Sequence, residues 1–295
     1  MQISLTGRLL CAAQQTYEIR TTGVTPPSPP TPAPPPSTLV GFVNPPPCFV
    51  DGVDGINAGL VGSTDTEIIV AFRGTEPFDS PDRGQMILDW LNDADAALVA
   101  EPGMPGLVHQ GFRDALDSVW AAMWPQIQAL TAANPKAPLY ITGHSKGGAM
   151  APLAAMRCQA AGLNPYVCTF AAARCGDQAF ADGYNAAVTH SVRYEYQDDI
   201  VPHLPPEDAL IELFKKIPFL AQTASGLTTG YASVGDLCFI NWSDQVVGDS
   251  SVLEFDRLLN LSKLLVTGGF EKVIDDHSIA PGSGYASVIC PGVWS

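Results

Sequence analysis

The run Gly143–Gly148, with the sequence G-H-S-K-G-G, constrains the fold more than any other part of the chain. It contains G-x-S-x-G and lies between an apolar, strand-like run at 139–142 and a helix-like run of small residues at 149–156. A serine at so sharp a strand-to-helix turn needs glycine on both sides, because the strained turn and the close helix–strand packing leave no room for a Cβ. The helix that follows directs free N–H groups and its positive dipole end at the place where negative charge would form. We interpret Ser145 as a nucleophile; the alternative is a glycine-rich turn that contains a serine by chance.

Length and composition predict a globular protein with a substantial core. The chain has 295 residues, of which 46% are hydrophobic and 15% are charged. We expect a single domain over residues 1–295. The formal net charge of −15 argues against a nucleic-acid partner and against electrostatic docking to anionic membranes.

Targeting and metal-binding patterns are weak in this chain. No apolar run reaches the roughly 18 residues of a transmembrane helix. Residues 1–10 lack the basic start and apolar centre of a signal peptide, so a cytoplasmic location is the default expectation, and a secreted one applies if the chain is a mature form. The seven cysteines form no C-x-x-C or C-x-x-H pair, and we predict no metal site.

Strand-like and helix-like segments alternate along most of the chain, which predicts an α/β architecture with a mainly parallel sheet. The predicted strands are 67–72, 139–142, 165–171 and 191–197. The predicted helices are 5–20, 111–130, 149–161 and 251–270, with a further amphipathic stretch at 207–220. Ligands of such sheets bind beyond the carboxyl ends of the strands, where Ser145 lies.

Prolines crowd between residues 25 and 47 so densely that a helix or a central strand is untenable there. We expect an extended, polyproline-like strap over the surface of the core. Binding of a partner by this segment is the open alternative.

A serine hydroxyl needs a base, usually histidine, that is oriented by a carboxylate. His144 adjoins the nucleophile on the strained turn, so its side chain should point elsewhere. If the order is serine, acid, histidine, the remaining bases are His203 and His277. His203 lies in a proline-stiffened loop too near the acids, and elimination favours His277. The best acids directly follow the strand at 191–197, and the candidates are Asp198 and Asp199, with Asp177 as the competitor.

Catalysis by a nucleophilic serine also requires donors to the oxyanion, because the loss of one typically costs about a hundred- to a thousandfold in kcat. The backbone N–H of Lys146, directly after the serine, is one candidate. Thr75 is the other, because it follows the end of an early strand and offers an N–H and a hydroxyl.

These residues together resemble the class-three (fungal-type) lipase family of α/β-hydrolases. Seven motifs besides the serine turn occur in the family's order from about residue 67 to residue 277. They are I-V-A-F-R-G-T at 69–75, D-W-L-N-D at 89–93, V-H-Q-G-F at 108–112, T-F-A-A-A-R-C-G-D at 169–177, D-D-I-V-P-H-L-P at 198–205, Y-A-S-V-G at 231–235 and D-H-S at 276–278.

The resemblance implies an α/β-hydrolase fold, with a mainly parallel central sheet flanked by helices. It implies Ser145, Asp199 and His277 as the catalytic triad and Thr75 and Lys146 as the oxyanion donors, and it assigns structural roles to His109 and Asp177. It also places a lid at 76–88, and the stretch at 207–230 is a second candidate cap.

Three positions depart from the family pattern. Lys146 stands where many members have leucine, which puts a cation at the rim of the pocket. Ala173 replaces a proline, and Ser233 replaces a histidine.

The expected activity is that of a serine carboxylic-ester hydrolase, a lipase acting on acylglycerols without cofactor or metal, in transient contact with a lipid interface. The alternatives are a short-chain or feruloyl-type esterase, a phospholipase, and a non-catalytic binding protein with a hydrolase fold.

Overall fold

The computed structural model describes residues 3–19, 39–43, 47–52, 56–75, 90, 96–218 and 220–291. Most of the predicted proline-rich strap at 25–47 and the whole predicted lid at 76–88 lie outside these ranges. The statements on structure below refer to the described residues.

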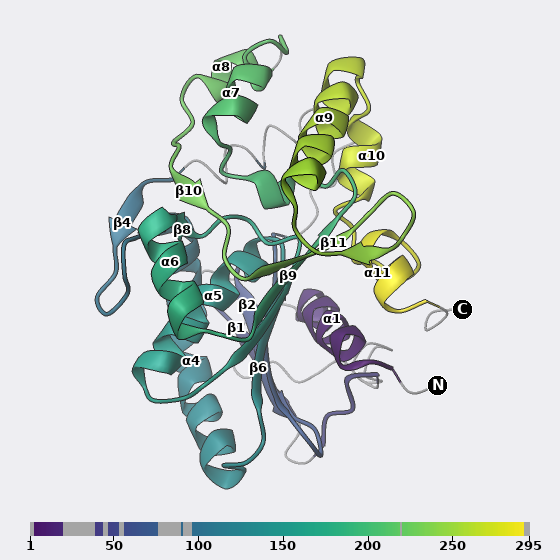
Figure 1. The fold of residues 1–295 in the computed structure, drawn as a ribbon. Helices are drawn as coiled ribbons and strands as arrows, with labels where there is room; N and C mark the ends of the chain where they lie inside the picture. The colour runs from purple at the N-terminus through teal and green to yellow at the C-terminus, as the bar shows by residue number, and fades with distance from the viewer. Residues whose placement is uncertain are drawn as a thin grey trace.

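A central sheet of eight described strands forms the middle layer of the molecule (Figure 1). In spatial order its strands are β1 (Cys48–Asp51), β2 (Ala58–Ser63), β3 (Ile68–Phe72), β6 (Leu139–His144), β7 (Tyr166–Phe170), β9 (Ser191–Tyr196), β11 (Asp236–Ile240) and β12 (Val246–Val247). The five strands from β3 to β11 are parallel, whereas β1, β2 and β12 pair antiparallel at the two edges. The predicted mainly parallel sheet is confirmed, and all four predicted strands belong to it.

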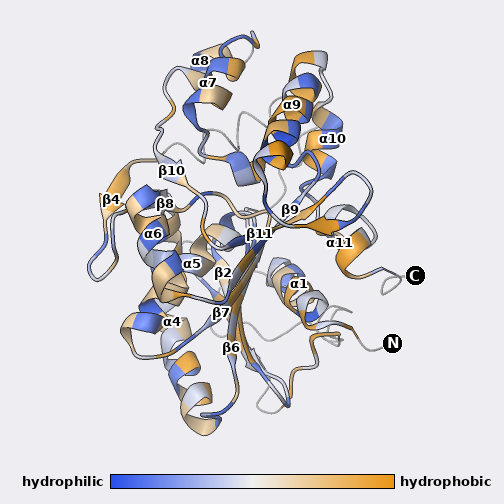
Figure 2. Cartoon of the chain, viewed as in Figure 1, coloured by the Kyte–Doolittle hydropathy of each residue, from blue (hydrophilic) through white to orange (hydrophobic). Residues whose placement is uncertain are grey.

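Helices cover both faces of this sheet (Figure 1). On one face lie α4 (Gln110–Ala133), α5 (Lys146–Ala160) and α6 (Gln178–Ala187), and on the other lie α1 (Leu5–Gln15) and α11 (Gly284–Ile289). Because successive strand residues point to opposite faces, Val70 and Phe72 pack into the α4–α5 core, while Ile69 and Ala71 pack into the α1 core. Figure 2 shows the resulting concentration of hydrophobic residues along the central strands.

Four further helices lie beyond the carboxyl ends of the parallel strands, at the top of Figure 1. They are α7 (Asp208–Phe214), α8 (Ala221–Ala224), α9 (Ser251–Thr267) and α10 (Phe270–Asp275). The predicted helix at 251–270 is therefore two helices, because Gly268 adopts a φ of 80° and ends α9 in a left-handed cap. Leu210, Ile211 and Phe214 of α7 are buried.

A small second sheet pairs β10 (Tyr231–Ala232), β8 (Gly176–Asp177), β5 (Leu107–His109) and β4 (Leu98–Ala100) in that order. The sequence analysis did not predict it, because strands of two or three residues leave no periodic pattern. Two short 3₁₀ helices, η1 (Thr16–Glu18) and η2 (Val201–His203), complete the described elements. The first predicted helix thus ends at Gln15 and continues as η1. A helix that could span a bilayer is absent from the described part of the chain.

Candidate active site

Ser145 lies at the turn between β6 and α5, with φ 58° and ψ −125°. This left-handed backbone is rare for a residue with a side chain and is typical of strained functional turns. A Cβ on Gly143 would lie 2.3 Å from the carbonyl oxygen of Gly147, and a Cβ on Gly147 would lie 2.2 Å from that of Phe72. Both glycines are therefore required by close backbone contacts. Because of this geometry, α5 begins at Lys146, directly after the serine and earlier than the predicted residue 149.

The structure brings Ser145, His277 and Asp199 together. His277 Nε2 lies 3.0 Å from Ser145 Oγ, and His277 Nδ1 lies 3.1 Å from both carboxylate oxygens of Asp199. Ser145 follows β6, Asp199 follows β9, and His277 follows α10, so three separate segments meet at the carboxyl end of the sheet. All three side chains are buried. A hydroxyl, an imidazole and a carboxylate in this order can transfer the serine proton to the histidine.

Two further groups orient the Asp199 carboxylate. The hydroxyl of Tyr285 donates to Oδ2 at 2.8 Å, and the backbone N–H of Val201 donates to Oδ1 at 2.9 Å. An ionised carboxylate only accepts hydrogen bonds, so these donors fix its plane toward His277. The sequence analysis missed Tyr285, because it lies 86 residues from Asp199 along the chain.

The two predicted oxyanion donors flank the serine. Lys146 is the first residue of α5, so its backbone N–H lies at the positive end of the helix dipole. Thr75 follows Gly74, and a Cβ on Gly74 would lie 3.0 Å from the Ser145 Cβ. The loop that leads to Thr75 therefore approaches Ser145 too closely to carry a side chain at residue 74.

Residues 69–209, just under half of the chain, match the family profile described as "Lipase (class 3)". This region belongs to the class 3 lipase family. The match runs from β3 to the start of α7 and includes Ser145 and Asp199. His277 lies beyond it.

Similar proteins include the secreted mono- and diacylglycerol lipase 1 of Fusarium solani, which is 35% identical over 99 residues, or 34% of this chain and 30% of the relative. The lipase of Rhizomucor miehei is 32% identical over 154 residues, or 49% of this chain and 39% of the relative. The chain thus spans well under half the length of these two curated relatives.

A solved structure of a deletion mutant of the Rhizomucor miehei lipase propeptide complex has a TM-score of 0.60 to this chain. The two share 23% sequence identity, over 84% of this chain and 70% of that one. This similarity shows the α/β-hydrolase fold.

Trp90 is the described residue of the class 3 lipase tryptophan–aspartate segment. Its ring centroid lies 4.8 Å from that of His277, at an interplanar angle of 60°. The indole thus packs against the imidazole in a tilted arrangement.

The competing acids of the class 3 lipase region have other partners. Asp198 accepts a hydrogen bond from Trp242 Nε1 at 3.1 Å and lies 3.5 Å from the Lys272 ammonium. Asp177 is the N-cap of α6 and accepts from the backbone N–H of Phe180 at 2.8 Å. Each of these two carboxylates therefore bonds its own partners, and neither is paired with the imidazole of His277.

Two other histidines of this region have structural contacts. His109 is the N-cap of α4 and accepts the backbone N–H of Phe112 at 3.2 Å. His203 Nε2 lies 3.4 Å from a guanidinium nitrogen of Arg257. Burial and the Arg257 charge lower the pKa of His203 to about 3, so this ring is neutral and accepts.

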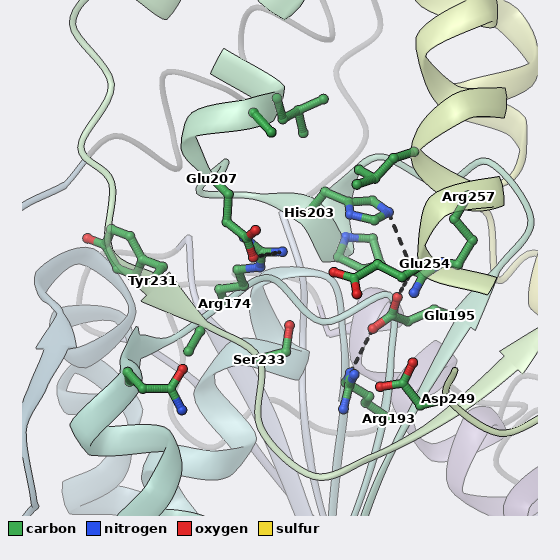
Figure 3. A pocket seen from close by; sticks show the side chains of 16 residues that line it. Arg174, Arg193, Glu195, His203, Glu207, Tyr231, Ser233, Asp249, Glu254 and Arg257 are labelled. Atoms are coloured by element: carbon green, nitrogen blue, oxygen red, sulfur yellow. Dashed lines mark hydrogen bonds and ion pairs between the residues drawn. The ribbon is translucent and has the colours of Figure 1, made fainter. Parts of the chain in front are cut away.

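A charged cavity of about 240 Å³ is lined by residues of β9, β10, α7 and α9, and its lining does not include Ser145, Asp199 or His277 (Figure 3). Within it, Glu195 pairs with Arg257 and, at 2.8 Å, with Arg193. Arg174 pairs with Glu207 at 2.9 Å. The buried carboxylate and guanidinium groups neutralise one another, which ties β9 to α9.

Proposed function

We propose that this protein is a serine carboxylic-ester hydrolase, a lipase that cleaves acylglycerol esters through an acyl-enzyme intermediate. The observation that carries the proposal is the hydrogen-bonded series Ser145–His277–Asp199 on a strained turn inside a class 3 lipase region. The relatives named as mono- and diacylglycerol lipase or lipase support the choice of an acylglycerol substrate.

In the first half-reaction, Ser145 Oγ attacks the ester carbonyl carbon while His277 Nε2 takes the hydroxyl proton. Asp199 keeps His277 in the tautomer whose Nε2 can accept and stabilises the imidazolium that forms. The carbonyl oxygen becomes an oxyanion, to which the Lys146 backbone N–H and Thr75 donate. When the tetrahedral intermediate collapses, His277 gives the proton to the leaving alcohol.

In the second half-reaction, water attacks the acyl group on Ser145 and gives a proton to His277. The second tetrahedral intermediate uses the same oxyanion donors. Its collapse returns the proton to Ser145 Oγ and releases the fatty acid. Every proton moves between atoms of the triad, the substrate and water.

We also propose that residues 76–88 and 207–230 form the lid and cap of the acyl site. Their place in the class 3 lipase pattern supports the first, and the position of α7 and α8 beyond the carboxyl ends of the strands supports the second. The ammonium of Lys146 would then lie at the rim and favour substrates with polar or anionic groups near the ester.

Ser145→Ala tests the catalytic assignment. We expect turnover of p-nitrophenyl butyrate to fall about a thousandfold or more, because the nucleophile is lost while the fold is kept. A fluorophosphonate probe should label the wild type on Ser145 and leave Ser145→Ala unlabelled. Ser118→Ala is the matched control, since its hydroxyl donates to the Ala115 carbonyl within α4. Full activity of Ser145→Ala would refute the mechanism. It would mean that the ester turnover does not depend on Ser145, which is the result expected of a non-catalytic binding protein.

A substrate panel separates the remaining ester classes. A lipase should prefer p-nitrophenyl palmitate and acylglycerol emulsions to the soluble butyrate ester. A short-chain or feruloyl-type esterase would show the reverse order, with activity on a feruloyl ester in the second case. Release of fatty acid from phosphatidylcholine in preference to acylglycerols would identify a phospholipase.

A further inference from the structure

The segment that ends α1 and forms η1 contacts two different parts of the candidate site. The side-chain amide of Gln14 donates to the backbone carbonyl of Ile279, two residues after His277. The backbone carbonyl of Ile19 accepts from Arg73 Nη1 at 2.8 Å, in the loop that leads to the candidate oxyanion donor Thr75. An element from the start of the chain therefore supports loops from two distant parts of the sequence.

Tyr17 lies between these two contacts and reaches the nucleophile turn. Its hydroxyl oxygen is 2.7 Å from His144 Nδ1, and His144 Nε2 is 2.9 Å from the backbone carbonyl oxygen of His277. The rings of His144 and His277 are also in contact, with centroids 4.6 Å apart. A Cβ on Gly74 would lie 2.2 Å from the Tyr17 hydroxyl oxygen and 2.7 Å from the backbone carbonyl oxygen of His144, so a side chain there would force a shift. Tyr17 thus touches the oxyanion loop and, through His144, the base.

The protons of this series can be assigned from its acceptors. A carbonyl oxygen only accepts, so His144 Nε2 must carry a proton and donate to His277. Burial and the neighbouring His277 lower the pKa of His144 well below its ordinary value, so the ring is neutral and its Nδ1 carries no proton. The Tyr17 hydroxyl therefore donates to His144 Nδ1. This bond selects one of the two tautomers of the imidazole.

We propose that Tyr17 is a positioning residue for the reaction: its hydroxyl fixes the His144 tautomer that donates to the His277 carbonyl, and so holds the His277 ring against Ser145. The inference rests on the proposed ester hydrolase function. His277 lies in the turn after α10, where its backbone N–H donates to the Ile274 carbonyl at 3.1 Å and its own carbonyl accepts from His144. In the other tautomer, His144 Nε2 would turn a lone pair toward the carbonyl and repel it. A base displaced by even about 1 Å can lower a rate by about a hundredfold.

Tyr17→Phe removes this hydroxyl and keeps the ring. We expect kcat on p-nitrophenyl butyrate to fall about tenfold with KM changed less than about twofold, because substrate binding is retained while the base is misplaced. Titration with a fluorophosphonate gives the concentration of folded sites for both proteins. Tyr166→Phe is the matched control, since Tyr166 is also half-buried but packs against Tyr140 and His190, away from the site.

A second variant separates tautomer selection from a general structural effect. His144→Gln places an amide N–H where His144 Nε2 lies, and an amide has no alternative tautomer. In this background we expect Tyr17→Phe to change kcat less than about twofold, so the two substitutions are strongly non-additive. Equal losses in both backgrounds would mean that Tyr17 acts through packing alone and would contradict the inference.

The outcomes for the inference and for the proposed function are distinct. A wild type that turns over esters and is labelled on Ser145, with a Tyr17→Phe variant of unchanged kcat, would overturn the role of Tyr17 and leave the ester hydrolase intact. A wild type that neither turns over esters nor reacts with the probe would overturn both.

Discussion

Tyr285 is a fully buried residue that serves two groups with one hydroxyl. It accepts a hydrogen bond from the backbone N–H of Tyr196 at 3.0 Å and donates to Asp199 Oδ2 at 2.8 Å. Burial and the nearby Asp199 charge raise the pKa of Tyr285 well above its ordinary value, so the hydroxyl stays a donor throughout the physiological range. One side chain therefore couples the end of β9 to the candidate catalytic acid.

Tyr285→Phe should affect both stability and rate. The Tyr196 N–H would be left buried without a partner, which costs about 1–3 kcal/mol in the free energy of unfolding. Asp199 would lose one donor, and we expect kcat to fall about tenfold. Urea unfolding and ester kinetics measure the two effects. Tyr184→Phe is the control, because its buried hydroxyl bonds Ser191 at 2.8 Å and should lower stability alone. A Tyr285→Phe variant with lower stability but wild-type kcat would separate this hydroxyl from the function of Asp199.

At the scale of elements, β9 directs side chains to both faces of the sheet. Tyr196 points toward Tyr285 on the α11 side, whereas Glu195 points toward Arg257 on α9. Burial by itself would raise the pKa of Glu195, but Arg257 and Arg193 outweigh this effect and lower it to about 2. Such a depressed carboxyl pKa stabilises the folded state above the unfolded-state pKa of about 4.5 and loses this contribution as the pH falls toward 2.

Glu195→Gln should therefore destabilise the protein in a pH-dependent manner. At pH 7 we expect a loss of about 3 kcal/mol in the free energy of unfolding, because two guanidinium groups lose their buried partner. The difference from wild type should shrink as the pH falls below about 4.5. Urea unfolding across this range tests it, with Glu212→Gln as the exposed control beside Lys215. A difference that stays constant with pH would contradict the electrostatic origin.

The elements that sequence predicted well are those with strong local patterns. The apolar runs of β3, β6, β7 and β9 stand out without any tertiary information. In contrast, Gly59 and Gly62 interrupt the apolar pattern of β2. This strand is recognised only from its pairing with the neighbouring strands. Gly268–Gly269 marks the break between α9 and α10, but apolar residues lie on both sides of it, so the pattern alone predicts one helix.

The site residues, too, could be predicted where they lie in strong local patterns. Ser145 and the carboxylates after β9 lie in local motifs, so their chemistry can be read from adjacent residues. Tyr17 and Tyr285 contact the site across 127 and 86 residues, and no spacing in the sequence relates them to it. The candidate reacting groups could therefore be predicted from the sequence. The groups that orient them could not.

At the scale of the whole molecule, the net charge of −15 should govern which lipid surfaces the proposed lipase can use. We expect low activity on emulsions that contain anionic lipid at low ionic strength, because surface and protein repel each other. Raising the ionic strength to about 0.5 M shortens the range of this repulsion to well under about 10 Å. Activity on anionic emulsions should then rise several-fold.

Neutral acylglycerol emulsions and soluble p-nitrophenyl butyrate are the controls, and both should change little with salt. A pH-stat measures fatty-acid release from the emulsions, and absorbance follows the soluble ester. The same response to salt on neutral and anionic emulsions would show that the global charge has no part in adsorption.

The order of the triad along the chain has a consequence for biosynthesis. Ser145 and Asp199 are translated well before the candidate base, since His277 follows Asp199 by 78 residues. At about 5–20 residues per second, a ribosome needs about 4–16 seconds to add that stretch. Throughout this interval Ser145 and Asp199 are present without the candidate base His277. A nascent chain should thus lack the proposed esterase activity until His277 has been added and has folded beside Ser145.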